Sequence, residues 1–381
     1  MARLALTRLT LTNFRNYSGL RLDVSARLVA LSGPNGAGKT NLLEALSLLA
    51  PGRGLRGASF DELAHIAAAN SWAIAAEVAT PFHDVKLGTG WSAAANEAGT
   101  PGRVVLIDGH LQKSSGALGD HMRILWLTPA MDGLFAGPAG DRRRFMDRLV
   151  ATFDPEHNSR VAVFEKVMRE RNLLLQEMRA DMVWMASLEA RMAEAAVAIA
   201  AARITAIEAL QKNIHDTRGE SAFPHALIAI DGEIENLVRR MPAVRAEDEY
   251  RRLLADSRVA DRAANRTLRG THRSDLSVTH GPKSMPAESC STGEQKALLI
   301  GLILAQARAV KTVAEVAPVL LLDEVAAHLD RPRREGLFAA LEALGSQAWM
   351  TGTDGHLFEG LGAHAQRFHV DAATLVEMKR A

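Results

Sequence analysis

The segment 33-GPNGAGKT-40 decides the fold of this chain, because it combines three glycines with a lysine and a threonine in a fixed order. It fits the pattern G-x-x-x-x-G-K-[ST], in which a glycine-rich loop joins a strand to a helix. The flanks agree, since RLVAL (27–31) is apolar like a buried strand and NLLEALSLLA (41–50) has helical spacing. Such a loop aims backbone N–H groups at phosphate oxygens, and the helix N-terminus adds partial positive charge. The sequence therefore predicts a phosphate-binding loop rather than a chance glycine-rich turn.

Each side chain of this loop has an expected task. Lys39 would reach the β- and γ-phosphates of a nucleoside triphosphate, and the Thr40 hydroxyl would ligate Mg²⁺. The predicted nucleotide contacts are Gly33, Pro34, Asn35, Gly36, Ala37, Gly38, Lys39, Thr40 and Asn41.

A second motif, 319-VLLLDEVAAHLD-330, places an acidic pair at the end of an apolar run. Four apolar residues predict a buried strand that delivers Asp323 to its end, where its carboxylate would hold Mg²⁺. Glu324 beside it would polarise the attacking water as a catalytic base. The alternative is a strand that merely ends in a solvated acidic pair, and the phosphate loop in the same chain favours the catalytic interpretation.

A third motif, 291-STGEQ-295, opens an apolar helical stretch. Ser291 and Glu294 have the spacing of a capping box, so plain helix capping is one interpretation. Gly293 and Gln295 are not needed for a cap. Free N–H groups at a helix start suit a phosphate, so the sequence predicts that Ser291, Gly293, Glu294 and Gln295 contact a γ-phosphate.

Composition excludes several classes of protein. The 381 residues are 48% hydrophobic and 23% charged, with a net charge of +1, as in ordinary globular proteins. The single cysteine, Cys290, allows no intramolecular disulfide and fits a reducing compartment. The N-terminus does not read as a signal peptide, because arginines interrupt its apolar run and the residues alternate as in a strand. Apolar runs such as 297–307 are shorter than the roughly 18 residues of a membrane span. We therefore expect a cytoplasmic protein with no membrane partner.

The chain changes character along its length. The first third is rich in strand patterns, with Asp108-Gly109 predicting a tight hairpin between apolar runs. Residues 141–216 have helical spacing throughout and predict a hairpin-like helical insertion. The last third returns to α/β patterns, with QAWMTGTD (347–354) expected as the final core strand. We expect one α/β domain formed by residues 1–130 and 271–381, interrupted by a mainly helical domain over 131–270.

The three motifs in this order resemble the ATP-binding-cassette (ABC) class of ATPases. About 250 residues separate the phosphate loop from the STGEQ motif, which resembles the DNA-repair branch that includes the structural-maintenance-of-chromosomes (SMC) proteins. The chain is most similar to the RecF family, and the resemblance covers nearly its whole length. It is carried by the three motifs and by LTNFRNY (11–17), PGRGLRG (51–57) with Arg53 and Arg56, GPAGDRRRFMDRLV (137–150) and GTHRSDL (270–276).

The resemblance implies an ABC-type P-loop head, with a mixed sheet core and an antiparallel β subdomain, interrupted by a helical domain. It implies ATP and Mg²⁺ as cofactors and an ATP-dependent homodimer, each ATP lying between Lys39 of one copy and Ser291 of the other. The dimer would clamp double-stranded DNA near single-strand gaps, act with RecR and RecO to load RecA, and reopen by slow, DNA-stimulated hydrolysis. Two alternatives remain: an ABC-type ATPase coupled to a transporter or ribosome, and an ATP-binding structural clamp that does not hydrolyse.

Two positions depart from the transporter pattern. Thr353 or Asp354 takes the place of a switch histidine, and His356 reads as a surface loop residue. LWLTPAMD (125–132) takes the place of the glutamine-bearing, Mg²⁺-linked loop, so its role is open.

Two arginine clusters are candidates for DNA contact, because arginines can neutralise phosphates. One comprises Arg142, Arg143, Arg144 and Arg148. The other lies in the segment 239–273, which contains ten arginines and only five acidic residues. The predicted contacts are Arg142, Arg143, Arg144, Arg239, Arg240, Arg251 and Arg252. The alternative is internal pairing with Asp141 and Asp147, and helix-surface pairs such as Asp248 with Arg252. Few aromatic residues accompany either cluster, which favours the duplex backbone over stacking on single strands.

Overall fold

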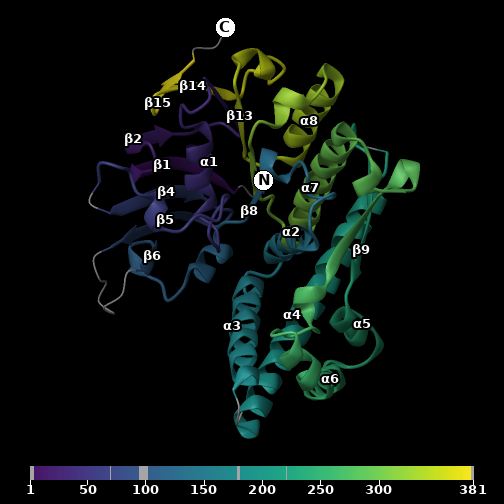
Figure 1. The fold of residues 1–381 in the computed structure, drawn as a ribbon. Helices are drawn as coiled ribbons and strands as arrows, with labels where there is room; N and C mark the ends of the chain where they lie inside the picture. Colours follow the sequence, from purple (N-terminus) through teal and green to yellow (C-terminus); the bar gives the residue numbers. More distant parts are fainter. Residues whose placement is uncertain (1–3, 69, 94–101, 178–180, 220, 379–381) are drawn as a thin grey trace. The chain divides into compact units, whose positions relative to one another are not determined.

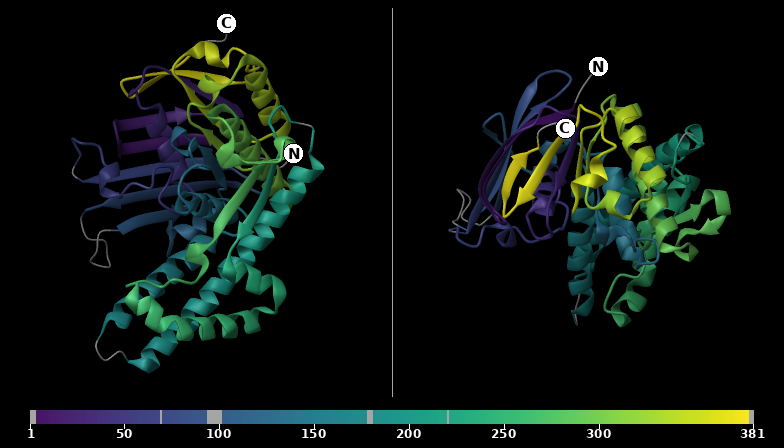
Figure 2. Two further views of the ribbon diagram at one scale, coloured as in Figure 1. Left: turned by 45° about the vertical axis from the view of Figure 1, so that its right-hand side comes forward. Right: turned by 90° about the horizontal axis from the view of Figure 1, so that it is seen from above.

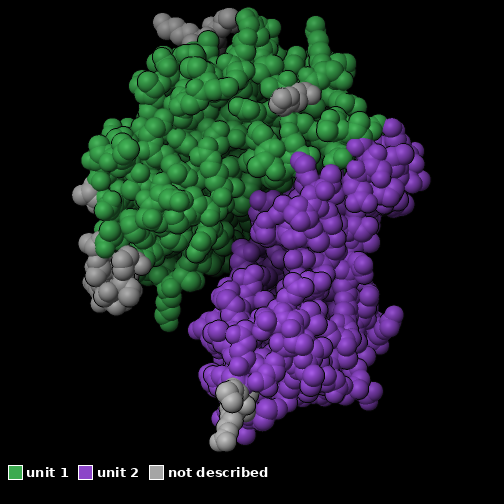
Figure 3. Space-filling model, viewed as in Figure 1, with its two compact units in different colours: residues 1–132, 217–225, 291–381 green, residues 133–216, 226–290 purple. Residues whose placement is uncertain are grey.

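The computed structural model describes residues 4–68, 70–93, 102–177, 181–219 and 221–378. The chain divides into two compact units, shown in different colours in Figure 3. The head unit comprises residues 1–132, 217–225 and 291–381, and the helical unit comprises 133–216 and 226–290. The expected domain boundaries differ from these units in three places: 131–132 and 217–225 belong to the head unit, and 271–290 belongs to the helical unit.

The head unit contains an antiparallel sheet with the strand order β2-β1-β4-β5-β6-β7. Its strands are β1 (Ala5–Phe14), β2 (Tyr17–Asp23), β4 (Ser71–Ala79), β5 (Asp84–Ser92), β6 (Gly102–Ile107) and β7 (His110–Leu111). Buried and more exposed residues alternate along β4, as one buried face requires. The predicted hairpin is confirmed, with Asp108 and Gly109 at φ of 50° and 82° between β6 and β7. The separate strand β2 was not expected.

A second sheet of the head unit has the order β15-β14-β3-β13-β12-β8. Its strands are β3 (Leu28–Ser32), β8 (Ile124–Leu127), β12 (Val319–Leu322), β13 (Ala348–Gly352), β14 (Gln366–Asp371) and β15 (Thr374–Glu377). β3, β12 and β13 are parallel and buried along their whole length, which explains their continuous apolar sequence. The expectation that β13 is the last strand is wrong, because β14 and β15 follow it as an antiparallel pair on the other side of β3.

The described residues of the head unit form three α-helices (Figure 1): α1 (Lys39–Ser47), α7 (Thr292–Ala314) and α8 (Arg331–Leu344). α1 belongs to the same hydrophobic core as side chains of both sheets, and it ends at Ser47, before the end of the segment 41–50 in which helical spacing was noted. α7 is long and apolar enough to cross a membrane, although the sequence was expected to hold no such stretch. However, 67% of its most apolar window is buried inside the fold, as in the core helix of a soluble protein.

The helical unit contains α2 (Ala139–Ala151), α3 (His157–Gln176), α4 (Met182–Asp216), α5 (Glu233–Arg240) and α6 (Ala243–Ala263). α3 and α4 run side by side as the predicted helical hairpin (Figure 2). A three-stranded sheet was not expected here; it comprises β9 (Ala226–Asp231), β10 (Asp275–His280) and β11 (Met285–Pro286). The described residues of the two units also form short 3-10 helices: η1 (Asp61–Leu63), η2 (Ser115–Asp120), η3 (Pro129–Met131), η4 (Thr271–Arg273), η5 (Gly281–Lys283), η6 (Ala287–Ser289), η7 (Val325–His328) and η8 (Gly355–Phe358).

Buried ion pairs cross-link the helical unit. The guanidinium of Arg171, which is fully buried, donates to Glu189 at 3.1 Å and to Asp261 at 2.8 Å. Arg203 donates to Asp147 at 2.8 Å and to Glu235 at 2.9 Å. Removing one partner of a buried pair leaves an uncompensated charge, so these pairs tie α2, α3, α4, α5 and α6 to one arrangement.

Candidate functional site

The predicted phosphate loop connects β3 to α1. Gly33, Gly36 and Gly38 all have positive φ, at 149°, 81° and 116°. A Cβ at Gly33 would lie 2.0 Å from the Val370 carbonyl oxygen, and one at Gly38 would lie 2.6 Å from Asn16 Nδ2. Glycine is therefore required by conformation at both positions and, at Gly33, also by close approach to the backbone of Val370.

Lys39 lies inside the curve of this loop. Its Nζ donates to the carbonyl oxygens of Gly33 at 2.7 Å and Pro34 at 2.8 Å, and the residue is only 4% exposed. Burial lowers the pKa of Lys39, while the nearby carboxylates of Glu324 and Asp323 act in the opposite direction. The ammonium group is thus held at the centre of the loop, close to both acidic residues of the second motif.

Asp323 meets the phosphate loop across the parallel sheet. It follows β12, and its backbone N–H donates to the Leu127 carbonyl at 2.8 Å, which continues the pairing with β8. Its carboxylate accepts hydrogen bonds from the Thr40 hydroxyl at 2.9 and 3.1 Å and from the Thr351 hydroxyl at 2.7 Å. Two motifs separated by about 280 residues are therefore in direct contact.

The oxygen atoms of Thr40 and Asp323 fit a magnesium ion. Mg²⁺ is usually held by one or two protein oxygens and by substrate phosphates, and it does not need a cage of side chains. Accordingly, no group of three or more His, Cys, Asp or Glu residues suited to a metal occurs among the described residues.

Glu324 is held in a strained backbone conformation at the same place. Its φ of 53° and ψ of 21° are left-handed, which costs a non-glycine residue about 1–3 kcal/mol. The backbone N–H donates to the Thr351 hydroxyl at 2.9 Å, which fixes this conformation. Glu324 lines a cavity of about 170 Å³ together with Asn35, Gly36, Gly38, Lys39, Thr40, Asn41 and Arg56.

Sequence reasoning missed Thr351, which contacts both acidic residues. It selected Thr353 and Asp354 instead, but both side chains are exposed, and Asp354 accepts the His356 N–H at 3.0 Å to cap η8. His356 is exposed as expected and pairs with Glu359. The signal for Thr351 was a hydroxyl inside an otherwise apolar strand, because a buried polar group needs a partner.

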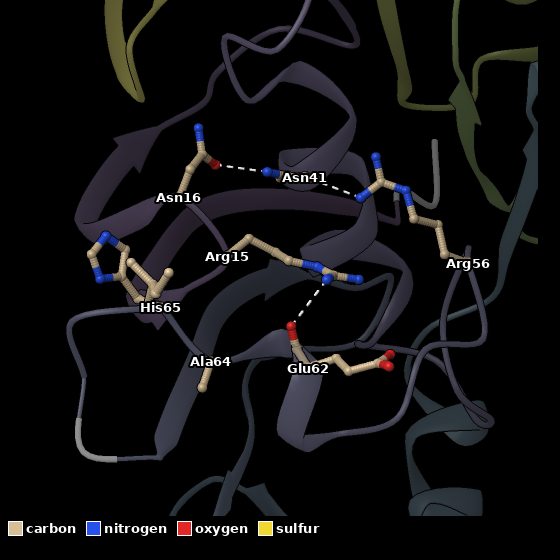
Figure 4. A pocket seen from close by; sticks show the side chains of 8 residues that line it. Arg15, Asn16, Asn41, Arg56, Glu62, Ala64 and His65 are labelled. Carbon is tan, nitrogen blue, oxygen red and sulfur yellow. Dashed lines mark hydrogen bonds between the residues drawn. The ribbon is translucent and has the colours of Figure 1, made fainter.

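A second cavity, of about 470 Å³, shares Asn41 and Arg56 with the first and is drawn in Figure 4. Its lining consists of Arg15, Asn16, Asn41, Arg56, Glu62, Ala64, His65 and Ile66. Asn41 links two of these side chains, since it donates to Asn16 at 2.8 Å and accepts from Arg56 at 2.8 Å. Sequence reasoning noted Arg53 and Arg56 only as part of a resemblance, and Arg53 is exposed and lines neither cavity.

The third motif begins α7 as predicted. Ser291 is the N-cap, and the Glu294 carboxylate accepts from its N–H at 3.0 Å and its hydroxyl at 2.9 Å. Ser291, Thr292 and Gly293 are exposed, and a Cβ at Gly293 would meet open space. Within the described part of the chain, neither Ser291 nor the residues up to Gln295 line the two cavities above. The structure does not bring this tip to the phosphate loop of its own chain.

Behind the tip, the side chains face inward. Gln295 and Lys296 are buried, and Lys296 Nζ donates to Asp132 Oδ2 at 3.0 Å. The segment 125–132, whose role was open, therefore forms most of β8 and η3 and ends in a contact with α7.

The arginine cluster 142–148 is largely engaged inside the helical unit. Arg142 donates to Asp275 at 2.9 Å and Arg143 to the Ser274 carbonyl at 2.7 Å. Burial lowers the pKa of Arg148 to about 10, and its guanidinium lies over the Phe145 ring. Only Arg144 among the four is exposed, and it pairs with Asp141. Asp147 pairs with Arg203 and His157 rather than within the cluster.

The second cluster lies on the surface of α5 and α6. Arg239, Arg240, Arg251 and Arg252 are all exposed. Arg251 pairs with Asp248, while Arg252 pairs with Glu249 and, at 3.7 Å, with Asp256. The expected pairing of Asp248 with Arg252 is thus replaced by pairs with other neighbours. Such pairs are weak and can be exchanged for phosphate contacts.

Comparison with known proteins gives a consistent result. The family described as RecF/RecN/SMC N terminal domain matches residues 5–364. The "DNA replication and repair protein RecF" of Mesorhizobium japonicum is 50% identical over 374 residues, covering 98% of both chains. The protein of the same name from Brucella suis is 49% identical over 374 residues, covering 98% of this chain and 96% of its own length.

Solved structures share the fold. The "recombination mediator protein RecF-ATP in RecFOR pathway" has a TM-score of 0.85 and 21% identity, covering 99% of this chain and 98% of its own. The Smc head domain of Pyrococcus furiosus, bound to the C-terminal domain of ScpA, has a TM-score of 0.54 and 15% identity, covering 98% and 96%. The expected fold, an α/β head interrupted by an inserted helical unit, is confirmed.

Proposed function

The chain belongs to the RecF family, and from this premise we propose that it is an ATP-dependent DNA-binding protein of recombinational DNA repair. The names of its relatives, which refer to DNA replication and repair and to the RecFOR pathway, support this assignment. In this proposal the protein acts in the cytoplasm with RecR and RecO on gapped DNA and promotes loading of RecA.

The contact between Thr40 and Asp323 carries the proposal, because it joins the phosphate loop to the acidic strand end. ATP would place its phosphates in the 170 Å³ cavity and its nucleoside in the adjoining 470 Å³ cavity. Thr40 and Asp323 would hold Mg²⁺, which would offset the negative charge of the phosphates. Lys39 orients the γ-phosphate, and the Glu324 carboxylate accepts a proton from the attacking water.

A second copy of the chain would complete the site. The exposed tip at Ser291 begins a helix of 23 residues, so the positive end of the helix dipole favours an anion there. Because the tip does not line the cavities of its own chain, we propose that it contacts the γ-phosphate bound by a partner. A monomer would lack part of the transition-state electrostatics, so turnover should be slow and should depend on dimerisation.

Duplex DNA would contact the exposed arginines of α5 and α6 rather than the engaged residues of α2. Arg239, Arg240, Arg251 and Arg252 present charge to solvent, whereas Arg142 and Arg143 donate to groups of their own unit. Arg144 is the exposed member of the α2 cluster and remains a candidate. Contacts of this kind neutralise phosphates without reading sequence.

Turnover measured against protein concentration tests the proposal. ATP hydrolysis per subunit should rise with protein concentration and rise again with duplex DNA, whereas Glu324→Gln should retain ATP-dependent dimers that scarcely hydrolyse. A parent rate independent of both variables would contradict the shared site. If the parent hydrolysis is negligible, and Glu324→Gln changes neither turnover nor dimer lifetime, the protein is a structural clamp and not an ATPase.

Gel mobility of duplex DNA tests the class of partner. The proposal expects a shift that requires ATP and weakens with salt, because phosphate contacts release counterions. No ATP-dependent shift at low salt would favour an ATPase coupled to a transporter or ribosome.

A further inference from the structure

Glu44 is a buried carboxylate that the catalytic scheme above does not use. It lies in the second turn of α1, five residues after Lys39, and its side chain is only 1% exposed. Its oxygens accept from Arg15 Nε at 2.8 Å and Arg15 Nη2 at 2.9 Å, a two-pronged contact. The same carboxylate accepts from Arg56 Nη1 at 2.9 Å. One anion inside the protein therefore holds two arginines.

Both arginines face the cavities in which the nucleotide is proposed to lie. Arg15 and Arg56 line the 470 Å³ cavity, and Arg56 also lines the 170 Å³ cavity beside Lys39 (Figure 4). Their side chains are 21% and 41% exposed, so their guanidinium groups are partly open to a ligand. Without an anion between them, two guanidiniums this close would repel each other.

The arrangement leaves donors free. Arg56 donates through Nη1, to Asn41 and to Glu44. Its Nε and Nη2 have no hydrogen-bond acceptor among the described residues. Arg15 is fixed more tightly. Its Nη1 donates to the Glu62 carbonyl at 3.0 Å, its N–H to the Leu63 carbonyl at 2.7 Å, and its φ is a left-handed 53°. Arg15 and Glu44 thus form a rigid base against which Arg56 is oriented.

We infer that Glu44 is a positioning residue for nucleotide binding, which orients Arg56 toward the phosphates and keeps Arg15 beside the nucleoside. The inference rests on the proposed function. An arginine that is already oriented loses less conformational freedom when the ligand binds, and this raises affinity. Glu44 touches neither cavity, so its effect passes entirely through the two arginines.

Replacement of Glu44 by Gln distinguishes a role of Glu44 in positioning the two arginines from a purely electrostatic effect of its negative charge on the nucleotide. The change removes a negative charge close to the site of a polyanion, so electrostatics alone predicts tighter binding of Mg-ATP. Positioning predicts the opposite, because the amide N–H₂ cannot accept from a guanidinium and the two arginines separate. We expect the dissociation constant for Mg-ATP, measured by titration calorimetry on the full chain, to rise about tenfold.

Matched variants exclude a general loss of structure. Gln347 is buried in the same unit and bonds the backbone of Leu6 and Ala26, away from both cavities, so Gln347→Leu should lower stability without weakening Mg-ATP binding. In an Arg56→Ala background, Glu44→Gln should have a much smaller effect than in the parent, since the arginine that it orients is already absent. Glu44→Asp keeps the charge but is too short to reach both arginines, so binding should weaken by several-fold.

The outcomes are distinguishable. A parent protein that does not bind Mg-ATP overturns the proposed function. Parent binding together with unchanged or tighter binding by Glu44→Gln overturns the inference, as does a full additional tenfold loss in the Arg56→Ala background. If Glu44→Gln does not fold, Glu44→Asp decides the matter, and binding equal to the parent then overturns the positioning role.

Discussion

Replacing Thr351 with Val should uncouple catalysis from nucleotide binding. The Thr351 hydroxyl donates to Asp323 at 2.7 Å and accepts the Glu324 N–H at 2.9 Å, and the residue is fully buried. Valine has nearly the same shape, so the backbone of β13 should stay in place. The substitution exchanges one oxygen for a methyl group between the two acidic residues.

The two hydrogen bonds of the Thr351 hydroxyl determine how much stability and activity the valine variant should lose. A hydrogen bond to a charged group contributes about 1.5–3 kcal/mol, and leaving a buried N–H unsatisfied costs about 1–3 kcal/mol. Because the two losses share one hydroxyl, we expect a combined destabilisation of the head unit of about 3 kcal/mol. Glu324 would also lose the bond that fixes its left-handed backbone, so its carboxylate would leave its catalytic position. A general base contributes about a hundredfold or more, so kcat should fall at least about tenfold.

Three measurements on the same variant test this reasoning. Urea unfolding reports stability, steady-state hydrolysis reports kcat, and calorimetry reports Mg-ATP affinity, which should change little because Lys39 and the loop N–H groups are untouched. Thr351→Ser keeps the hydroxyl and is the matched control, so it should hydrolyse ATP close to the parent rate. The reasoning is refuted if the valine variant keeps the parent kcat, or if the serine variant loses as much activity as the valine variant.

Four further predictions follow from other parts of the chain. Lys39→Arg should weaken ATP-dependent dimerisation even where ATP still binds, because a guanidinium lacks the compact shape of an ammonium group; unchanged dimers in light scattering would count against the assigned role. Ser291→Arg should abolish these dimers and leave Mg-ATP binding by the monomer intact, and persistent dimers would remove Ser291 from the interface. Arg240→Ala should reduce the salt dependence of duplex binding by about one counterion, whereas an unchanged slope of log affinity against log salt would exclude Arg240 from the DNA surface. Burial lowers the pKa of His272 in the folded protein below the value of about 6.5 that it has in the unfolded chain. As the pH falls below about 6.5, the unfolded chain therefore takes up this proton before the folded protein does. The stability that His272 contributes above pH 6.5 is lost as the pH falls toward its folded pKa. His272→Gln should therefore flatten the decline in urea midpoint from pH 7 to 5, and a decline equal to that of the parent would refute this origin.

Local chemistry explains what the sequence could predict. The phosphate loop needs glycines at fixed spacing, and the acidic pair follows a short apolar strand, so each motif is complete within about ten residues. The capping box at Ser291 is equally local. Each of these features depends only on residues that are close in the sequence, so it can be recognised from the sequence alone.

Contacts between distant segments could not be predicted in this way. Thr351 reaches Asp323 only because β13 lies beside β12, and Glu44 reaches Arg15 only because the β1–β2 turn packs on α1. The strands β9 and β10 were not predicted from the sequence for a related reason. They are six residues each and are separated in the chain by α5 and α6, so their pairing with each other is visible only in the fold.

The position of β3 has a consequence for synthesis of the protein. This strand leads into the phosphate loop, yet both of its neighbours in the sheet, β13 and β14, lie within residues 348–371. A growing polypeptide therefore exposes β3 without either partner until residues 348–371 have left the ribosome, whereas β9, β10 and β11 of the helical unit precede these residues and can pair earlier. Late closure of this kind leaves an apolar strand open to misassembly during translation. It also means that a chain cut short before β13 cannot build a nucleotide site, so a prematurely terminated product would not compete with the complete protein for ATP.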